Sequence, residues 1–135
     1  MDQQEKRNFL QQYGAAELEE KRLDREVERW KTRTARTGAD YQLVRSAGED
    51  NPELAQAVRQ IANLTRDLIR QRSKLTALRQ SIGAAIDSVS DDRLKELLRL
   101  RYIDGMTWEK IAEQMNYSCM QINRLHSKAL SQINM

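Results

Sequence analysis

The sequence has little of what builds a cross-linked, metal-binding or large globular domain. Its 135 residues include one cysteine, one histidine and one proline, and only 5% are aromatic. A single cysteine excludes an internal disulfide, and one cysteine with one histidine cannot form a zinc site within one subunit. Because only 39% of the residues are hydrophobic, the chain cannot bury a large core. We expect neither a metal nor a cofactor.

The sequence also lacks the features that are typical of membrane proteins and of enzymes. No segment approaches the roughly 18 consecutive apolar residues of a membrane span, and the charged amino terminus lacks the apolar run of a signal peptide. The sequence has no phosphate-cradling glycine-rich loop and no nucleophile elbow, and its histidine has no evident serine or cysteine partner. We therefore expect a cytoplasmic protein that is not an enzyme and has no membrane partner.

Charged residues make up 32% of the chain and accompany long periodic segments, which favours extended helices. From 54 to 89, apolar residues alternate at spacings of three and four over five heptads, as in a coiled coil. Asn51 is the expected cap, and Pro52 the first helical residue. Gln71 is the lone polar position of this seam. We expect the seam to mediate oligomerisation, through Leu54, Ile61, Leu64, Leu68, Gln71, Leu75, Leu78 and Ile82.

The segment from Asp2 to about Thr34 has a weaker helical repeat of nearly the same length. Together the two segments predict a long antiparallel helical hairpin over residues 1–89, with a loop at about 35–51. Periodicity alone cannot say whether the seam pairs within one chain or between two chains. Of these alternatives we favour a homodimer.

Residues 90–135 predict three shorter helices. The first is expected to have Ser90 as its cap and to bury Leu94, Leu97, Leu98 and Tyr102. Gly105 is suited to a left-handed position after this helix, and Thr107 to the start of the next. Ser118 and Gln121 have the spacing of a capping box. The predicted fold class is therefore all-α, with a helical hairpin followed by a helix-turn-helix domain.

The last helix would leave one face free to enter the roughly 12 Å wide major groove of DNA. Arginine can pair with guanine, and asparagine or glutamine with adenine, whereas lysine suits a phosphate. The expected base contacts are Cys119, Met120, Gln121, Asn123 and Arg124. The expected phosphate contacts are Arg101, Thr107, Lys110, Ser118, Ser127 and Lys128. His126 is expected to face solvent or a phosphate.

These residues carry a family resemblance. The stretch from Leu98 to Leu130 resembles region 4 of bacterial sigma factors. The resemblance lies at its start, where LRLRY is followed by DG and T, and near its end, in SKAL. That resemblance implies promoter DNA and RNA polymerase as partners. It places Cys119, Met120, Asn123 and Arg124 toward bases, and Arg101, Thr107 and Lys128 toward the backbone.

A longer stretch, RYIDGMTWEKIAEQMNYSCMQINRLHSKAL, is similar to phage-encoded regulators of the ArpU/RinA type. This resemblance implies a transcriptional activator of phage genes that acts in the cytoplasm of a bacterial host cell. Two alternatives stay open: a small terminase subunit that recognises packaging-site DNA, and an adaptor that binds polymerase or sigma without DNA contact.

Segment 90–135 has seven basic and six acidic residues, hence a charge of only +1. Such a weakly basic module needs dimerisation or a partner to bind DNA well.

Overall fold

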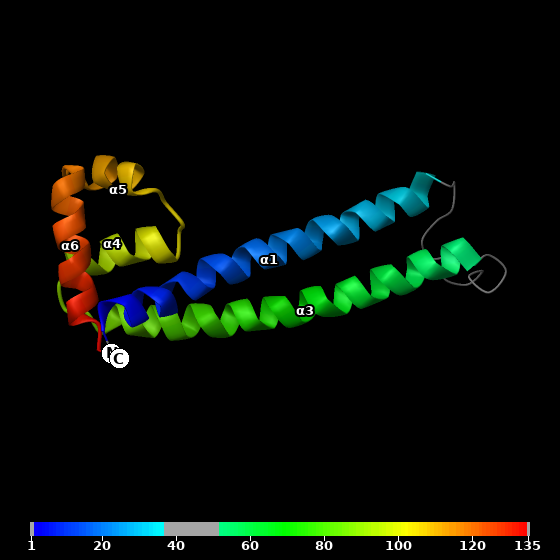
Figure 1. Ribbon diagram of the computed structural model, residues 1–135, viewed down its shortest axis with the longest axis horizontal. Coiled ribbons are helices and arrows are strands. Elements are labelled where there is room, and N and C mark those ends of the chain that lie inside the picture. Colours follow the sequence, from blue (N-terminus) through cyan, green and yellow to red (C-terminus); the bar gives the residue numbers. More distant parts are fainter. Residues whose placement is uncertain (1, 37–51, 135) are drawn as a thin grey trace. The chain divides into compact units, whose positions relative to one another are not determined.

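The computed structural model describes residues 2–36 and 52–134, and in these ranges it contains five α-helices and no strand. In Figure 1 the helices follow the chain as α1 (Gln3–Arg36), α3 (Pro52–Asp87), α4 (Asp92–Tyr102), α5 (Trp108–Met115) and α6 (Cys119–Gln132). The predicted all-α class is confirmed, with two long helices that pack against each other and three short ones. No helix in the described part combines the length and apolar character needed to cross a membrane.

The chain forms two compact units that divide both long helices. One unit contains residues 1–16 and 75–135, and the other contains residues 17–74. Below, residues 1–16 with 75–135 are called the terminal unit, and residues 17–74 the arm unit. Each is a folded body with its own buried side chains.

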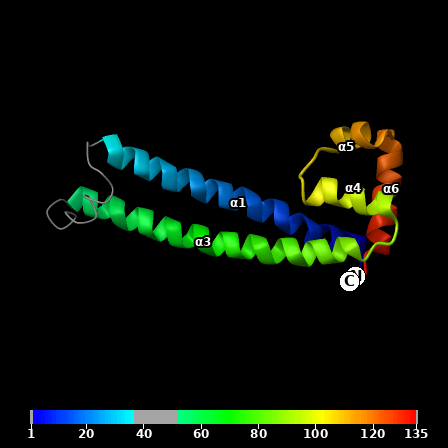
Figure 2. The same cartoon turned by 180° about the vertical axis from the view of Figure 1, so that it is seen from behind.

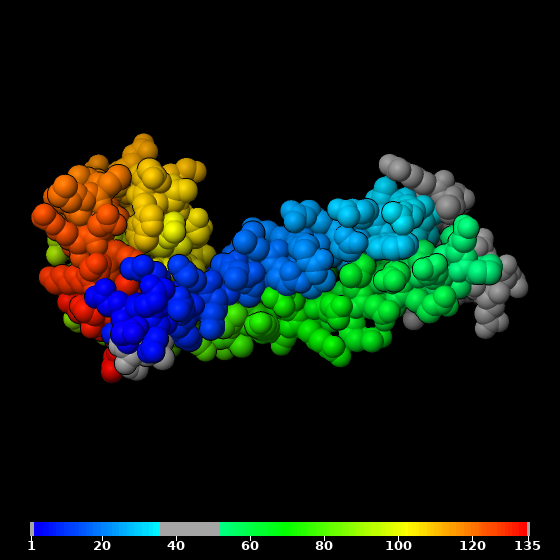
Figure 3. Space-filling view, in the orientation of Figure 1, coloured from blue at the N-terminus to red at the C-terminus, as the bar shows by residue number. Residues whose placement is uncertain are grey.

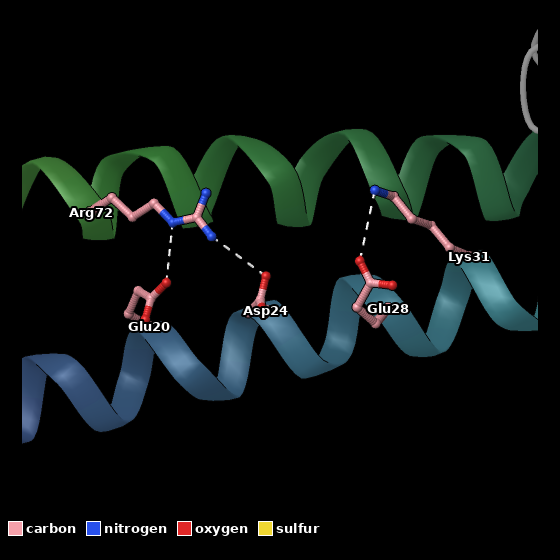
Figure 4. A network of polar contacts seen from close by, with 5 residues as sticks. All are labelled: Glu20, Asp24, Glu28, Lys31 and Arg72. Atoms are coloured by element: carbon pink, nitrogen blue, oxygen red, sulfur yellow. Dashed lines mark hydrogen bonds and ion pairs between the residues drawn. The ribbon is translucent and has the colours of Figure 1, made fainter.

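The arm unit has a small apolar core. Leu23 and Val27 of α1 pack with Leu68 of α3, and Leu64 lies against them partly buried. Charged side chains join the same two helices, because Arg72 Nε lies 3.1 Å from a Glu20 carboxylate oxygen and another Arg72 nitrogen lies 3.5 Å from Asp24 (Figure 4). In this unit the seam of α3 therefore meets α1 of the same chain.

The terminal unit contains the larger core. Leu10 of α1, Ile82 and Ile86 of α3, and Val89 belong to one buried cluster with residues of α4, α5 and α6. The carboxy-terminal members of this cluster are Leu94, Leu97, Leu98, Leu100, Tyr102, Ile111, Ala112, Ile122, Ala129, Leu130 and Ile133. Figure 2 shows α4, α5 and α6 grouped together from behind. The helix-turn-helix thus shares its core with the start of α1 and the end of α3.

Every predicted seam residue is at least half-buried within the single chain. Ile61, Leu68 and Ile82 are buried, and the half-buried members are Leu54, Leu64, Gln71, Leu75 and Leu78. The seam is therefore already covered in part by the chain's own helices. A role of these residues in oligomerisation stays a prediction.

Two helix starts can be compared with expectation. Pro52 is the first residue of α3, as predicted, whereas Asn51 and residues 37–51 of the expected loop lie outside the described residues. Ser90 was predicted to cap α4, and this is wrong, because Asp91 is the cap. The Asp91 carboxylate accepts the Arg93 N–H at 2.9 Å and pairs with the Arg93 guanidinium at 3.4 Å. A charged acceptor next to the helix start provides both interactions at once.

Candidate nucleic-acid interface

Local caps set the geometry of α5 and α6. The Thr107 hydroxyl accepts the Lys110 N–H at 3.3 Å, and Asn116 closes α5 in the left-handed conformation with φ of 59°. Ser118 and Gln121 form the predicted capping box, in which the Ser118 hydroxyl accepts the Gln121 N–H at 3.1 Å. Gly105, with φ of 69°, lies between α4 and α5 in the left-handed region, as expected. These caps confirm the predicted starts of both helices.

The two faces of α6 differ sharply in exposure. Ile122, His126, Ala129 and Leu130 are buried, and every residue predicted to face bases is exposed. Met120 is 65% exposed, and its sulfur lies 3.8 Å from an Arg124 guanidinium nitrogen. The exposed face carries Cys119, Met120, Gln121, Asn123, Arg124, Ser127 and Lys128. Side chains with the donors and acceptors that read base edges therefore share one surface.

Gln121 is constrained within this surface. Its side-chain oxygen accepts the Ser118 N–H at 2.8 Å as the second half of the capping box. With the cap intact, its amide nitrogen can still donate to a base, and its oxygen keeps one lone pair. Asn123 and Arg124 are the exposed residues of α6 suited to adenine and guanine, respectively.

The predicted phosphate contacts fall into two groups. Thr107, Lys110 and Ser118 lie exposed at the starts of α5 and α6, whereas Ser127 and Lys128 lie exposed on the last half of α6. Arg101 differs from all of these because it is half-buried. Its guanidinium stacks 4.4 Å from the centre of the Trp108 ring and donates to the Met106 carbonyl oxygen at 3.0 Å.

His126 was expected to face solvent or a phosphate, and this is wrong. Its side chain is 5% exposed, with Nε2 2.6 Å from the Tyr102 hydroxyl and its ring edge-on to Trp108 at 4.6 Å. Position 126 follows Ile122 by four residues and therefore lies on the same buried face. Burial lowers the pKa of His126 to about 4, with the positive charges of Arg7 and Arg101 acting in the same direction. Burial also raises the pKa of Tyr102.

Residues at the start of α1 also contact α6, which sequence reasoning missed. Gln3 donates to the Ser127 carbonyl oxygen at 3.1 Å, and Lys6 Nζ donates to the Leu130 carbonyl oxygen at 3.0 Å. Because the last turn of α6 has no basic residue, Lys6 supplies the cation that favours a helix carboxyl end. Figure 3 shows these amino-terminal residues in blue against the red end of the chain. No pattern in the sequence links positions so far apart.

Comparison with known proteins bears on the same three helices. Residues 91–134, which include α4, α5 and α6, match the family model described as Sigma-70, region 4. No curated protein and no solved structure matches the chain significantly. The carboxy-terminal segment is therefore similar to sigma-70 region 4, a helix-turn-helix, and this similarity implies that the chain binds DNA in a regulatory role.

Proposed function

We propose that this protein is a sequence-specific transcription regulator of phage or mobile-element genes, an activator of the ArpU/RinA type. The observation that carries the proposal is the division of α6 into a buried apolar face and an exposed polar face, within the segment similar to sigma-70 region 4. The resemblance of RYIDGMTWEKIAEQMNYSCMQINRLHSKAL to phage regulators supports the finer role. RNA polymerase of the host is the second partner that an activator of this kind needs.

On DNA, α6 enters the major groove with its exposed face toward the bases. Arg124 pairs with the acceptor edge of a guanine and Asn123 with an adenine, and Met120 contacts a thymine methyl group. Thr107 and Lys110 at the start of α5, and Lys128 on α6, bind phosphates and hold the helix in register.

Two copies of the chain bind together. Segment 90–135 has seven basic and six acidic residues, and a net charge of +1 supplies little non-specific affinity on its own. The arm unit has a small core and leaves Leu18 and Ile69 exposed by 69% and 62%. Pairing of two arm units would cover these side chains in a four-helix core. A two-fold dimer then binds an inverted repeat with half-sites one or more helical turns apart.

Selection of bound sequences from a random pool of duplex DNA tests the proposal. The full chain is expected to enrich an inverted repeat, and an Arg124→Ala variant run in parallel is expected to lose the preference at one position of each half-site. Failure to enrich any sequence would contradict the proposal and favour the adaptor. If the chain enriches a DNA sequence but sediments as a ring-sized oligomer, the result would favour a small terminase subunit instead.

A further inference from the structure

A polar cleft of about 220 Å³ lies within the terminal unit, beside α6. The start of α1 contributes Arg7 and Gln11, the end of α4 contributes Arg101 and Tyr102, and Trp108 and Asn123 come from α5 and α6. Buried His126 completes the lining. The cleft is several times larger than the roughly 30 Å³ that one water molecule takes up in the liquid. It has room for a small hydrated group.

The charge of this cleft is one-sided. Arg7 and Arg101 are both half-buried, and among the residues that the structure describes no acidic side chain lines the cleft. Neither arginine forms an ion pair within residues 2–36 and 52–134. Two guanidinium groups on one cleft give it an excess of positive charge, which the stack of Arg101 on Trp108 offsets only in part.

The guanidinium nitrogens of Arg7 and Arg101 are only partly paired by hydrogen bonds in the described part of the chain. The Nε atom of Arg7 is buried and has no hydrogen-bond partner in the described part of the chain. Arg101 is held in place by Trp108 and by the Met106 carbonyl, and these contacts leave other guanidinium nitrogens for a ligand. The amides of Gln11 and Asn123 are exposed and add further donors at the cleft.

We propose that this cleft binds a phosphate group, held by the two guanidinium groups of Arg7 and Arg101. Guanidinium forks match the oxygens of phosphate in charge and geometry. The proposed function makes a DNA backbone phosphate the natural source, since Asn123 belongs to both the cleft and the exposed face of α6. In that role the inference rests on DNA binding, and it adds Arg7, far outside the matched segment 91–134, to the DNA-binding surface.

Inorganic phosphate tests the site without DNA. The chain has two tryptophans, so a Trp30→Phe background leaves Trp108, in the cleft, as the only fluorescent indole. Phosphate is expected to change its emission and to raise the melting temperature relative to chloride of equal ionic strength. Arg7→Gln should abolish both effects, Arg7→Lys should retain part of them, and Arg79→Gln, a charge-matched control on α3 outside this cleft, should leave them intact.

Folding of the variant can be judged from the same melts. Arg7→Gln removes one of two like charges, so in chloride it is expected to melt at or above the temperature of the unaltered chain. Phosphate effects that are equal in the Arg7→Gln and unaltered chains would overturn the proposal. So would acetate acting as strongly as phosphate at equal ionic strength, because the cleft would then be a carboxylate site.

DNA measurements identify the source of the phosphate. If it belongs to DNA, Arg7→Gln should reduce the slope of log K against log salt by about 1, as expected for one lost phosphate contact. An unchanged slope together with Arg7-dependent phosphate binding would support a site for free phosphate. A chain that binds phosphate but no duplex DNA would contradict the proposed function while supporting the cleft.

Discussion

Position 126 shows how a single residue depends on its neighbours in space. A histidine near the end of a candidate recognition helix suggests a contact with DNA, yet this one lies between Tyr102 and Trp108 with 5% of its surface exposed. The positive charges of Arg7 and Arg101 near the ring disfavour a third positive charge there. The imidazole therefore acts as a neutral, buried hydrogen-bonding group at neutral pH.

This burial predicts a loss of stability in mild acid. The pKa of His126 is about 4 in the folded chain and about 6.5 in the unfolded chain. Above pH 6.5 neither state binds the proton, and below it the unfolded state alone does, so the free energy of unfolding falls as the pH drops toward 4. At about 1.4 kcal/mol per pKa unit, the loss reaches up to roughly 3 kcal/mol.

Urea unfolding at pH 7 and pH 5 measures this effect. Because carboxylates also titrate in acid, the comparison is between the unaltered chain and His126→Gln. The variant should lose clearly less stability between these pH values. An equal loss in both chains would show that His126 is not the group responsible.

On the exposed face of α6, the roles of two cations can be separated. Arg124→Ala should cost about 1 to 3 kcal/mol on the preferred site and blur the sequence preference, because it removes a base contact. Lys128→Ala should weaken binding to all DNA similarly and flatten the salt dependence by about 1. Titrations on preferred and random duplexes at several salt concentrations distinguish them. If both variants lose affinity equally on the preferred and the random duplex, the assignment of Arg124 to bases and Lys128 to phosphates is wrong.

At the scale of single helices, short-range signals determine where α5 and α6 begin. Thr107 and Ser118 each accept a backbone N–H three residues ahead, and Asn116 provides the left-handed turn between the helices. These residues determine where α6 starts, and Cys119 and Met120 lie exposed in its first turn. The start of α6 therefore depends on local caps as well as on long-range contacts.

Removal of one cap should measure its contribution. Ser118→Ala loses the acceptor for the Gln121 N–H and is expected to lower the free energy of unfolding by about 1 kcal/mol. Ser131 offers a matched control, because its exposed hydroxyl donates to the Lys128 carbonyl within the helix and caps no free N–H. Thermal or urea unfolding should show little change for Ser131→Ala. Equal destabilisation by both changes would mean that the capping box adds nothing specific.

At the scale of the whole molecule, the chain separates a larger core from a smaller one. The terminal unit joins five helical segments in one apolar cluster. The described part of the arm unit buries five hydrophobic residues, and only Leu23, Val27 and Leu68 form a cluster, with Leu64 beside them. A two-helix pair with so small a core is of marginal stability alone. This imbalance is the physical reason to expect a second copy at the arm unit.

Substitution of an exposed apolar residue in the arm unit tests that expectation. Ile69→Glu places a charge where the proposed dimer would exclude water, and the mass in sedimentation should fall from dimer to monomer. Ser73→Glu, which adds the same charge at another exposed position of α3, should stay dimeric. Helical content by circular dichroism should be similar in both variants. A dimer that survives Ile69→Glu would place the contact elsewhere.

Much of the fold follows from interactions within one or two helical turns. The sequence predicts the caps Thr107 and Ser118, the left-handed Gly105 and the periodic apolar positions from Leu54 onward, because these signals depend on residues within a few positions. The cap of α4 was placed one residue early, at Ser90 instead of Asp91. Neighbouring residues that are both good caps compete, and the ion pair with Arg93 favours the second.

The sequence by itself determined an all-helical chain with a helix-turn-helix at its end, since periodicity and capping depend on adjacent residues. Only the tertiary structure brought Lys6 and Arg7 to α6, buried His126 against Tyr102, and covered part of the coiled-coil seam with α1 of the same chain. These arrangements join residues that can be more than a hundred positions apart. No local preference encodes such pairs, because they form when apolar faces of separate helices are buried together.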